Sequence, residues 1–160
     1  MSRDAAVYAR ESAVISADAI RARMSAQGLQ VQWHGVAPPG ATAENWERGY
    51  FLAAGETDPR ARVDVTVEAL KDYLRQDAAS GVGDERYRAA ILAARTLYRF
   101  SVTWSADTER ERVLVNLIDV VAELGDGLVL DMLADRFYDL REYRAEHLGP
   151  LPEESAEGGQ

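Results

Sequence analysis

Apolar and polar residues alternate along residues 98–104, a period-two pattern that is typical of a strand with one buried face. A helix with an apolar stripe should begin at Thr108, because valine, leucine and isoleucine then recur every three or four positions. Thr108 and Glu111 have the spacing of a capping box, which would fix the start of that helix. Gly125 should end it in a left-handed conformation, and the apolar run 128–130 should form the next strand. This order indicates a right-handed crossover that joins two parallel strands.

The first third of the chain shows the same order in a weaker form. Residues 6–9 are typical of a strand, Ser16 of a helix N-cap, Gly28 of a helix end, and 29–33 of a second alternating strand. The shared order suggests an internal duplication, although the helix lengths differ and few residues match.

Two further strands and two helices are expected between these units. Residues 50–54 and 63–67 lie on either side of a turn-rich segment and should pair as antiparallel strands. Helical spacing follows over 68–76 and again over 84–95. The middle of the chain therefore predicts a hairpin followed by a pair of helices.

With a last edge strand expected around residues 136–138, these elements predict an α+β fold in which helices pack on a mixed sheet. Two ferredoxin-like strand–helix–strand units would satisfy the order, and a three-layer α/β fold is the alternative. The chain has 160 residues, enough for one buried core, so we expect a single domain over 1–148. Residues 149–160 are rich in glycine, proline and acids and predict a disordered acidic tail.

The formal net charge of −9 would repel a phosphate backbone, so nucleic acid is not an expected partner. An acidic surface suits a basic protein partner, although it also serves solubility alone. There is no cysteine, which excludes disulfides, thiolate catalysis and thiolate metal sites. The N-terminus lacks a signal-peptide pattern and no window has the ~20 apolar residues that span a bilayer, so we expect a cytoplasmic protein and no membrane contact.

Residue patterns that indicate catalysis are scarce. The chain has no phosphate-binding glycine loop and no G-x-S-x-G motif, and no serine has an evident base partner, so we predict no catalytic residue. His34 ends a strand beside a Pro-Pro-Gly loop, where it could face a ligand, but an exposed histidine without a function is the ordinary explanation. His147 is expected to be structural or solvated.

Acidic residues are the richest candidates for binding. Four of them lie in one short segment: Asp126, Asp131, Asp135 and Asp139. Converging carboxylates could bind Mg²⁺ or Ca²⁺. Their spacing does not match an EF-hand loop, however, and a turn would separate them. We therefore predict solvated acids at turns, no metal and no cofactor.

Trp46 is a further candidate, because Glu44 and Glu47 flank it in a polar stretch. An exposed tryptophan among acids could anchor a protein interface. The alternative is that its ring covers the sheet as part of the core.

The segment from Arg88 to Tyr138 contains YRFSVTW, an acid-led helix, GDGLVLD and RFYD. This order is similar to that of small uncharacterised bacterial α+β proteins, some of which are encoded beside toxins and resemble immunity proteins. The resemblance implies a cytoplasmic protein that acts by binding, and no functional residue is carried over with it.

Three functions stay open. The leading hypothesis is a non-enzymatic acidic protein-binding module, such as an immunity-type inhibitor of a basic effector. The second is a small-molecule or metal-binding protein with a pocket near His34. The third is a structural homo-oligomer joined through an unpaired edge strand. Under the first hypothesis the contact residues are Glu44, Trp46, Glu47, Asp126, Asp131, Asp135 and Asp139.

Overall fold

The computed structural model describes residues 2–103 and 108–149, which form one sheet with helices on both of its faces. The strands are β1 (Ser2–Ala9), β2 (Val31–Ala37), β3 (Arg48–Ala53), β4 (Val63–Ala69), β5 (Thr96–Thr103), β6 (Gly127–Asp131) and β7 (Arg136–Tyr138). The helices are α1 (Ala17–Ala26), α2 (Asp72–Ser80), α3 (Glu85–Ala93), α4 (Thr108–Gly125) and α5 (Leu140–His147), with a 3-10 turn at Pro59–Ala61.

The strand order is β2-β3-β4-β5-β1-β6-β7, and all neighbouring strands are antiparallel. The predicted α+β class is confirmed. The predicted mixture of strand directions is not observed, because β1 lies between β5 and β6. Those two strands run in the same direction, as the crossover predicted, but each pairs with β1 and they do not pair with each other.

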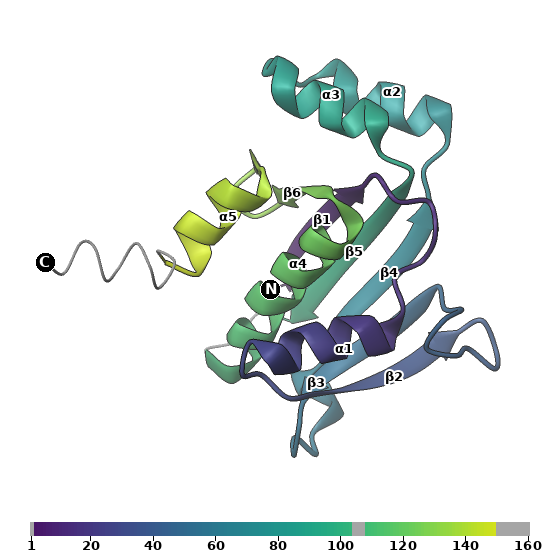
Figure 1. Ribbon diagram of the computed structural model, residues 1–160, viewed down its shortest axis with the longest axis vertical. Helices are drawn as coiled ribbons and strands as arrows, with labels where there is room; N and C mark the ends of the chain where they lie inside the picture. The colour runs from purple at the N-terminus through teal and green to yellow at the C-terminus, as the bar shows by residue number, and fades with distance from the viewer. Residues whose placement is uncertain (1, 104–107, 150–160) are drawn as a thin grey trace, which may run out of the picture.

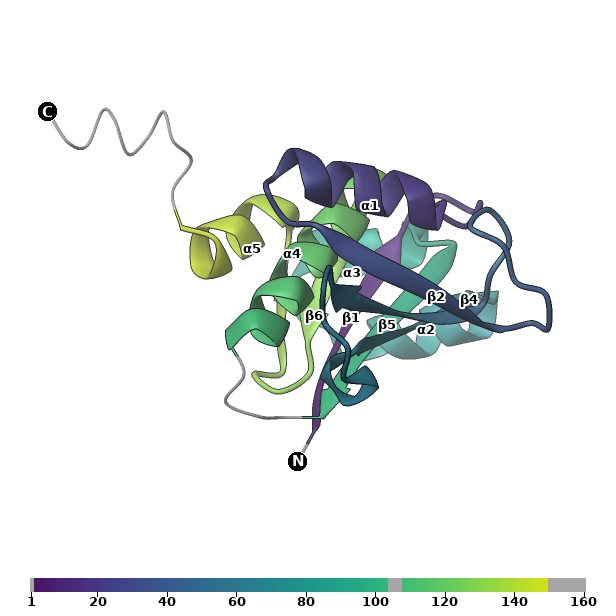
Figure 2. The ribbon, with the colours of Figure 1, turned by 90° about the horizontal axis from the view of Figure 1, so that it is seen from below.

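Helices α1, α4 and α5 cover one face of the sheet and lie above the strands in Figure 2. Alternate residues of β4 and β5 point into the core between these layers. The inward residues of β4 are Val63, Val65 and Val67, and those of β5 are Tyr98, Phe100 and Val102. This main core is the source of most apolar burial in the described chain.

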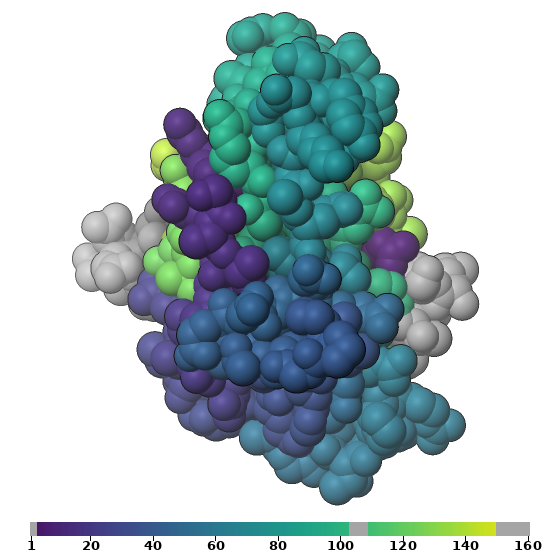
Figure 3. All heavy atoms as spheres, turned by 90° about the vertical axis from the view of Figure 1, so that its right-hand side faces the viewer, coloured from purple at the N-terminus to yellow at the C-terminus, as the bar shows by residue number. Residues whose placement is uncertain are grey.

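The opposite face is covered only in part. Helices α2 and α3 form a hairpin at one end of the strands, at the top of Figure 1, where Ile91 packs with Leu128. Figure 3 shows this hairpin at the top of another side of the molecule, with the loop that follows β2, in blue, standing out below it. The rest of this face carries polar side chains such as His34, Thr66 and Arg99, as is usual when an antiparallel sheet has one face in water.

Local signals place most of the helix ends correctly. The Ser16 hydroxyl caps α1 by accepting from Asp18 N at 3.1 Å, and Asp84 caps α3 by accepting from Arg86 N at 2.9 Å. Helix α2 begins later than residue 68, because β4 continues to Ala69 and pairs there with β5. The predicted hairpin of β3 and β4 and the edge strand β7 are confirmed.

The end of α4 differs from the prediction. Asp126, with φ of 50°, adopts the left-handed conformation that was expected at Gly125. Gly125 is buried, and a Cβ atom there would lie 2.8 Å from Ala9 Cβ. The glycine is therefore required for close packing of the helix end against β1 and not for its backbone freedom.

Three expectations fall outside what the structure describes: Trp104 in the predicted strand, the Thr108 side chain in the predicted capping box, and residues 150–160 of the predicted tail. Among residues 2–103 and 108–149, no helix combines the length and the apolar character that crossing a membrane requires.

Candidate functional site

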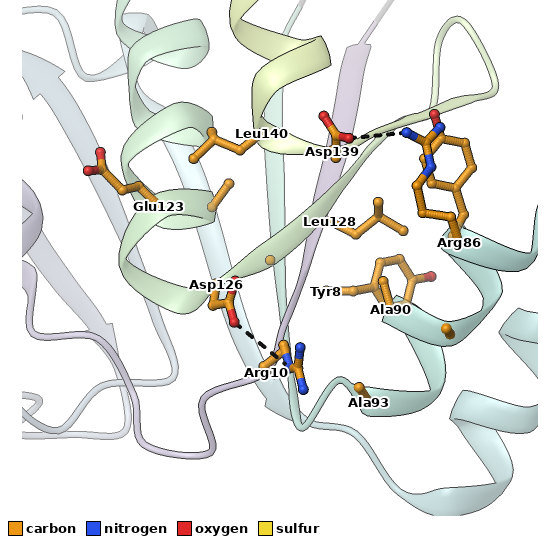
Figure 4. Close-up of a pocket in the computed structure, with 14 residues that line it drawn as sticks. Tyr8, Arg10, Arg86, Ala90, Ala93, Glu123, Asp126, Leu128, Asp139 and Leu140 are labelled. Carbon is orange, nitrogen blue, oxygen red and sulfur yellow. Dashed lines mark hydrogen bonds and ion pairs between the residues drawn. The ribbon is translucent and has the colours of Figure 1, made fainter.

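A cleft of about 470 Å³ lies at the edge of the sheet beside β6 (Figure 4). Helix α3 forms one wall, and the end of α4 with the start of α5 forms the other. Tyr8 and Leu128 form an apolar floor, and Ala90, Ala93 and Leu140 add apolar surface from the walls. The charged rim consists of Arg10, Arg86, Glu123, Asp126 and Asp139. We call this site the edge cleft.

The edge cleft contains a short length of unpaired strand. Strand β7 ends at Tyr138, opposite Val129, so Gly127 has no neighbouring strand on that side. Met132 N donates to Asp4 O at 3.2 Å, and hydrogen-bonding positions alternate along an antiparallel pair. It follows that Leu128 turns its main-chain groups toward β1, whereas Gly127 turns its N–H and C=O toward the cleft.

A capping box explains why β7 stops so early. Asp139 Oδ1 accepts from Glu142 N at 2.8 Å, and Glu142 Oε1 accepts from Asp139 N at 2.9 Å. Both bonds satisfy main-chain donors that a helix start leaves unpaired, so they fix the first turn of α5 directly after Tyr138. The chain leaves the sheet at this point, and residues 127 and 128 of β6 have no strand beside them on that side.

Small residues provide the space in the cleft. Helix α3 presents Ala89, Ala90 and Ala93 to it, and α4 presents Ala122. Gly127 could not carry a side chain, because a Cβ atom there would lie 2.6 Å from Val7 Cγ1. The main chain of β6 is therefore accessible from the cleft.

Carboxylates outnumber guanidinium groups around the rim. Arg86 lies 3.3 Å from Asp139, 3.5 Å from Glu142 and 3.6 Å from Asp84, measured between nitrogen and oxygen atoms. At the other end of the cleft, Arg10 and Asp126 form a single pair at 3.8 Å. Three carboxylates thus share one guanidinium at the Arg86 end, which leaves an excess of negative charge there.

Glu123 is neutralised separately within a network that joins α1, α4 and α5. Arg144 Nη2 donates to Glu123 Oε2 at 2.8 Å, and Arg144 Nε donates to the buried Asp119 Oδ1 at 2.6 Å. Arg23 also pairs with Glu123. This network holds α5 against α4 and so fixes one wall of the edge cleft.

The pKa shifts around the cleft favour fixed protonation states at neutral pH. Burial raises the pKa of Tyr8, and burial together with the hydrogen bond to Glu142 raises the pKa of Tyr87 to about 12. The pKa of Glu142 is lowered, first by the N–H of Asp139 and also by Tyr87 and Arg86. At neutral pH both tyrosines therefore keep their hydroxyl protons and Glu142 keeps its negative charge.

The structure brings two of the four predicted aspartates, Asp126 and Asp139, into the edge cleft. Asp131 is buried instead, and its Oδ1 accepts from two N–H groups of the following turn. Asp135 occupies that same turn with φ of 51°. Within the described ranges, no group of three or more acidic or histidine side chains is arranged to hold a metal ion.

Trp46 is buried, so the prediction of an exposed interface anchor is wrong and the core alternative is confirmed. Its side chain is 0% exposed, and its Nε1 donates to Ile15 O at 3.1 Å. Glu44 and Glu47 are exposed beside it. They lie next to β2 and β3, and four strands separate β2 from β6, so these two acids and the edge cleft do not form one contact surface.

His34 is exposed on β2, where its ring stacks on Tyr50 with 4.9 Å between centroids. It belongs to the polar face of the sheet and does not line the edge cleft. The pocket considered near His34 is therefore not the edge cleft.

The sequence alone does not identify Tyr8, Arg10, Arg86 or Leu128 as site residues, because they come from three distant parts of the chain. One local signal was available. The capping box Asp139-Leu-Arg-Glu142 follows the strand RFY directly, which predicts an edge strand that stops after three residues.

No protein-family model matches the chain, and no curated protein or solved structure is significantly similar to it. Its function must therefore be argued from the geometry of the site.

Proposed function

We propose that this chain is a non-enzymatic protein-binding module and that the edge cleft is its contact site. The observation that carries the proposal is an unpaired strand edge at the bottom of a cleft with an apolar floor and an acidic rim. Main-chain hydrogen bonds and apolar contacts supply affinity in such sites, and surrounding charges select the partner.

The charge of the chain supports a basic partner. Most acidic side chains of the described residues are paired with an arginine of the same chain, but three of them share Arg86, which lies on the cleft rim. A basic side chain from a partner would balance this excess. An immunity-type inhibitor that covers a basic effector is the finer form of the proposal.

Affinity purification from the source organism would test the proposal. We would compare the tagged full chain with Ala93→Leu, which fills the cleft from α3, and with Ala19→Leu, which adds the same side chain on the exposed side of α1. We expect a basic protein to co-purify with the parent and with Ala19→Leu, to dissociate at high salt, and to be depleted with Ala93→Leu. Equal recovery with both variants, or no partner at all, would argue against the proposal.

A small organic ligand is the second candidate, because about 470 Å³ lies within the usual volume of ligand pockets. A ligand that binds only the folded chain raises its melting temperature. A screen of metabolites and nucleotides should give no rise if the cleft binds protein alone, and a saturable rise that Ala93→Leu abolishes would favour the small ligand.

A further inference from the structure

We infer that the partner presents an extended segment, with basic and apolar residues, that adds to the sheet beside β6 in the edge cleft. This inference rests on the proposed function and names the chemistry of the partner. Three features of the cleft carry it: the orientation of the Gly127 main chain, the apolar floor, and the unequal charges around Arg86.

The main chain of Gly127 favours an extended peptide over a helix. Its N–H and C=O point toward the side that β7 leaves uncovered. A neighbouring extended chain supplies one acceptor and one donor at the matching separation, as in any antiparallel pair. The main-chain groups of a helical segment are bonded within the helix and cannot pair in this way.

The floor selects an apolar side chain. Side chains of a strand alternate between the two faces of a sheet, so every second residue of the segment would point toward α3. There it would meet the partly buried ring of Tyr8, which packs over the buried Leu128 and whose neighbour Phe137 lies 6.3 Å away between ring centroids. A branched aliphatic side chain would extend this apolar surface.

The charges at the Arg86 end select a basic side chain. Asp84, Asp139 and Glu142 share one guanidinium, and each of the three side chains is at least 31% exposed. A lysine or arginine of the segment could reach them without displacing Arg86. Because the pKa of Glu142 is lowered, its carboxylate keeps its charge well below neutral pH.

The test uses the full ¹⁵N-labelled chain and three synthetic nine-residue peptides. The first alternates lysine and valine, the second alternates glutamate and valine, and the third is the lysine–valine peptide with every second peptide nitrogen methylated. We expect the first peptide to shift the amide signals of Gly127, Leu128 and Ala90. The glutamate peptide should bind about tenfold more weakly, and so should the methylated peptide, which has lost the N–H donors along one edge of the extended chain.

A charge variant with a matched control makes the test specific. Asp84→Asn combined with Asp139→Asn removes two negative charges from around Arg86 while keeping both helix caps, because asparagine caps helices as well as aspartate does. Glu44→Gln combined with Glu47→Gln removes the same charge near β2. We expect the first pair to weaken lysine–valine binding about tenfold and the second pair to leave it unchanged.

Several results would overturn the inference: no shift at millimolar peptide, shifts confined to other residues, equal binding of all three peptides, or equal binding by both double variants. If affinity purification still yields a protein that Ala93→Leu depletes, the proposed function stands and only the extended basic segment is wrong. If neither experiment gives a partner, the proposed function and the inference of an extended basic segment are both wrong.

Discussion

The two edges of the sheet are built in opposite ways. Strand β2 is seven residues long and its exposed edge is protected. Arg21 Nε donates to Val31 O at 3.1 Å, a bulge interrupts the pairing between Gly35 and Ala37, and two prolines follow directly. Each of these features hinders the addition of another strand.

The other edge ends abruptly. Strand β7 has three residues, and the capping box at Asp139 directs the chain away into α5. The main chain of Gly127 is left open at the bottom of the edge cleft, where α3 and α5 restrict what can approach it. A partner must therefore fit the cleft before it can pair with the strand.

This difference indicates where binding should be sought. Proteins protect long edges because open ones pair indiscriminately, and an open edge inside a cleft allows pairing with a selected segment only. The contrast favours the edge cleft over β2 as the contact site. It also disfavours a homo-oligomer joined through β2, the longer of the two edge strands.

The largest expected effect concerns the protected edge. Trp46→Ala should lower the free energy of unfolding by about 3–5 kcal/mol, because it empties a fully buried site between Trp33 and Phe51. Urea denaturation measures this, and Trp46→Phe should lose less. A loss below about 1 kcal/mol would show that the ring is not part of the core and would revive its role as an interface anchor.

Removing Arg144 should loosen the wall of the open edge. Arg144→Met leaves the carboxylate of Asp119 buried without its main partner, and we expect a loss of about 2–3 kcal/mol, discounted because Arg144 is itself 28% exposed. Hydrogen exchange should rise in α5 and not in β2. An equal rise in hydrogen exchange across the whole chain would mean that the network does not stabilise the cleft in particular.

A single methyl group at the open edge should also be costly. Gly127→Ala places a Cβ atom 2.6 Å from Val7 Cγ1, and we expect a loss of about 1–3 kcal/mol in urea denaturation. Gly81→Ala is the matched control, since a Cβ atom at position 81 meets nothing within 4 Å. Equal stability of the two variants would contradict the close approach of β6 and β1.

The smallest expected effect is a pH dependence of the free energy of unfolding, caused by His147 beside β7. Burial lowers the pKa of His147, which packs on Tyr138 and Tyr143. Its folded pKa lies below the unfolded value of about 6.5, so its contribution to stability is present above that pH and is lost as pH falls. Because the ring is only half-buried, we expect less than about 1 kcal/mol between pH 7.5 and 5.5. His147→Gln should reduce this slope, and an unchanged slope would contradict the assignment.

Local chemistry made much of the fold predictable from the sequence. Period-two alternation identified β4 and β5, and side-chain oxygens of Ser16 and Asp84 marked helix starts. The position of β1 between β5 and β6 was not predictable, because strand order depends on contacts between distant segments. Residues 6–9 reveal nothing of their neighbours.

The candidate site was predictable only in fragments. Asp126 and Asp139 were identified as surface acids, but the cleft needs Tyr8 and Arg86 beside them, and tertiary packing alone brings these together. The prediction that Trp46 is exposed was wrong for a related reason. Its polar neighbours Glu44 and Glu47 point to water, while its own ring turns inward to the core.

One measurement compares the two edges directly. The lysine–valine peptide, with a benzophenone side chain at its centre, would be photo-crosslinked to the full chain and the attachment sites mapped by mass spectrometry. We expect crosslinks on α3 and in residues 126–140, at the edge cleft. Crosslinks concentrated on β2 and β3 would contradict it, because the protected edge would then be the one that accepts a strand.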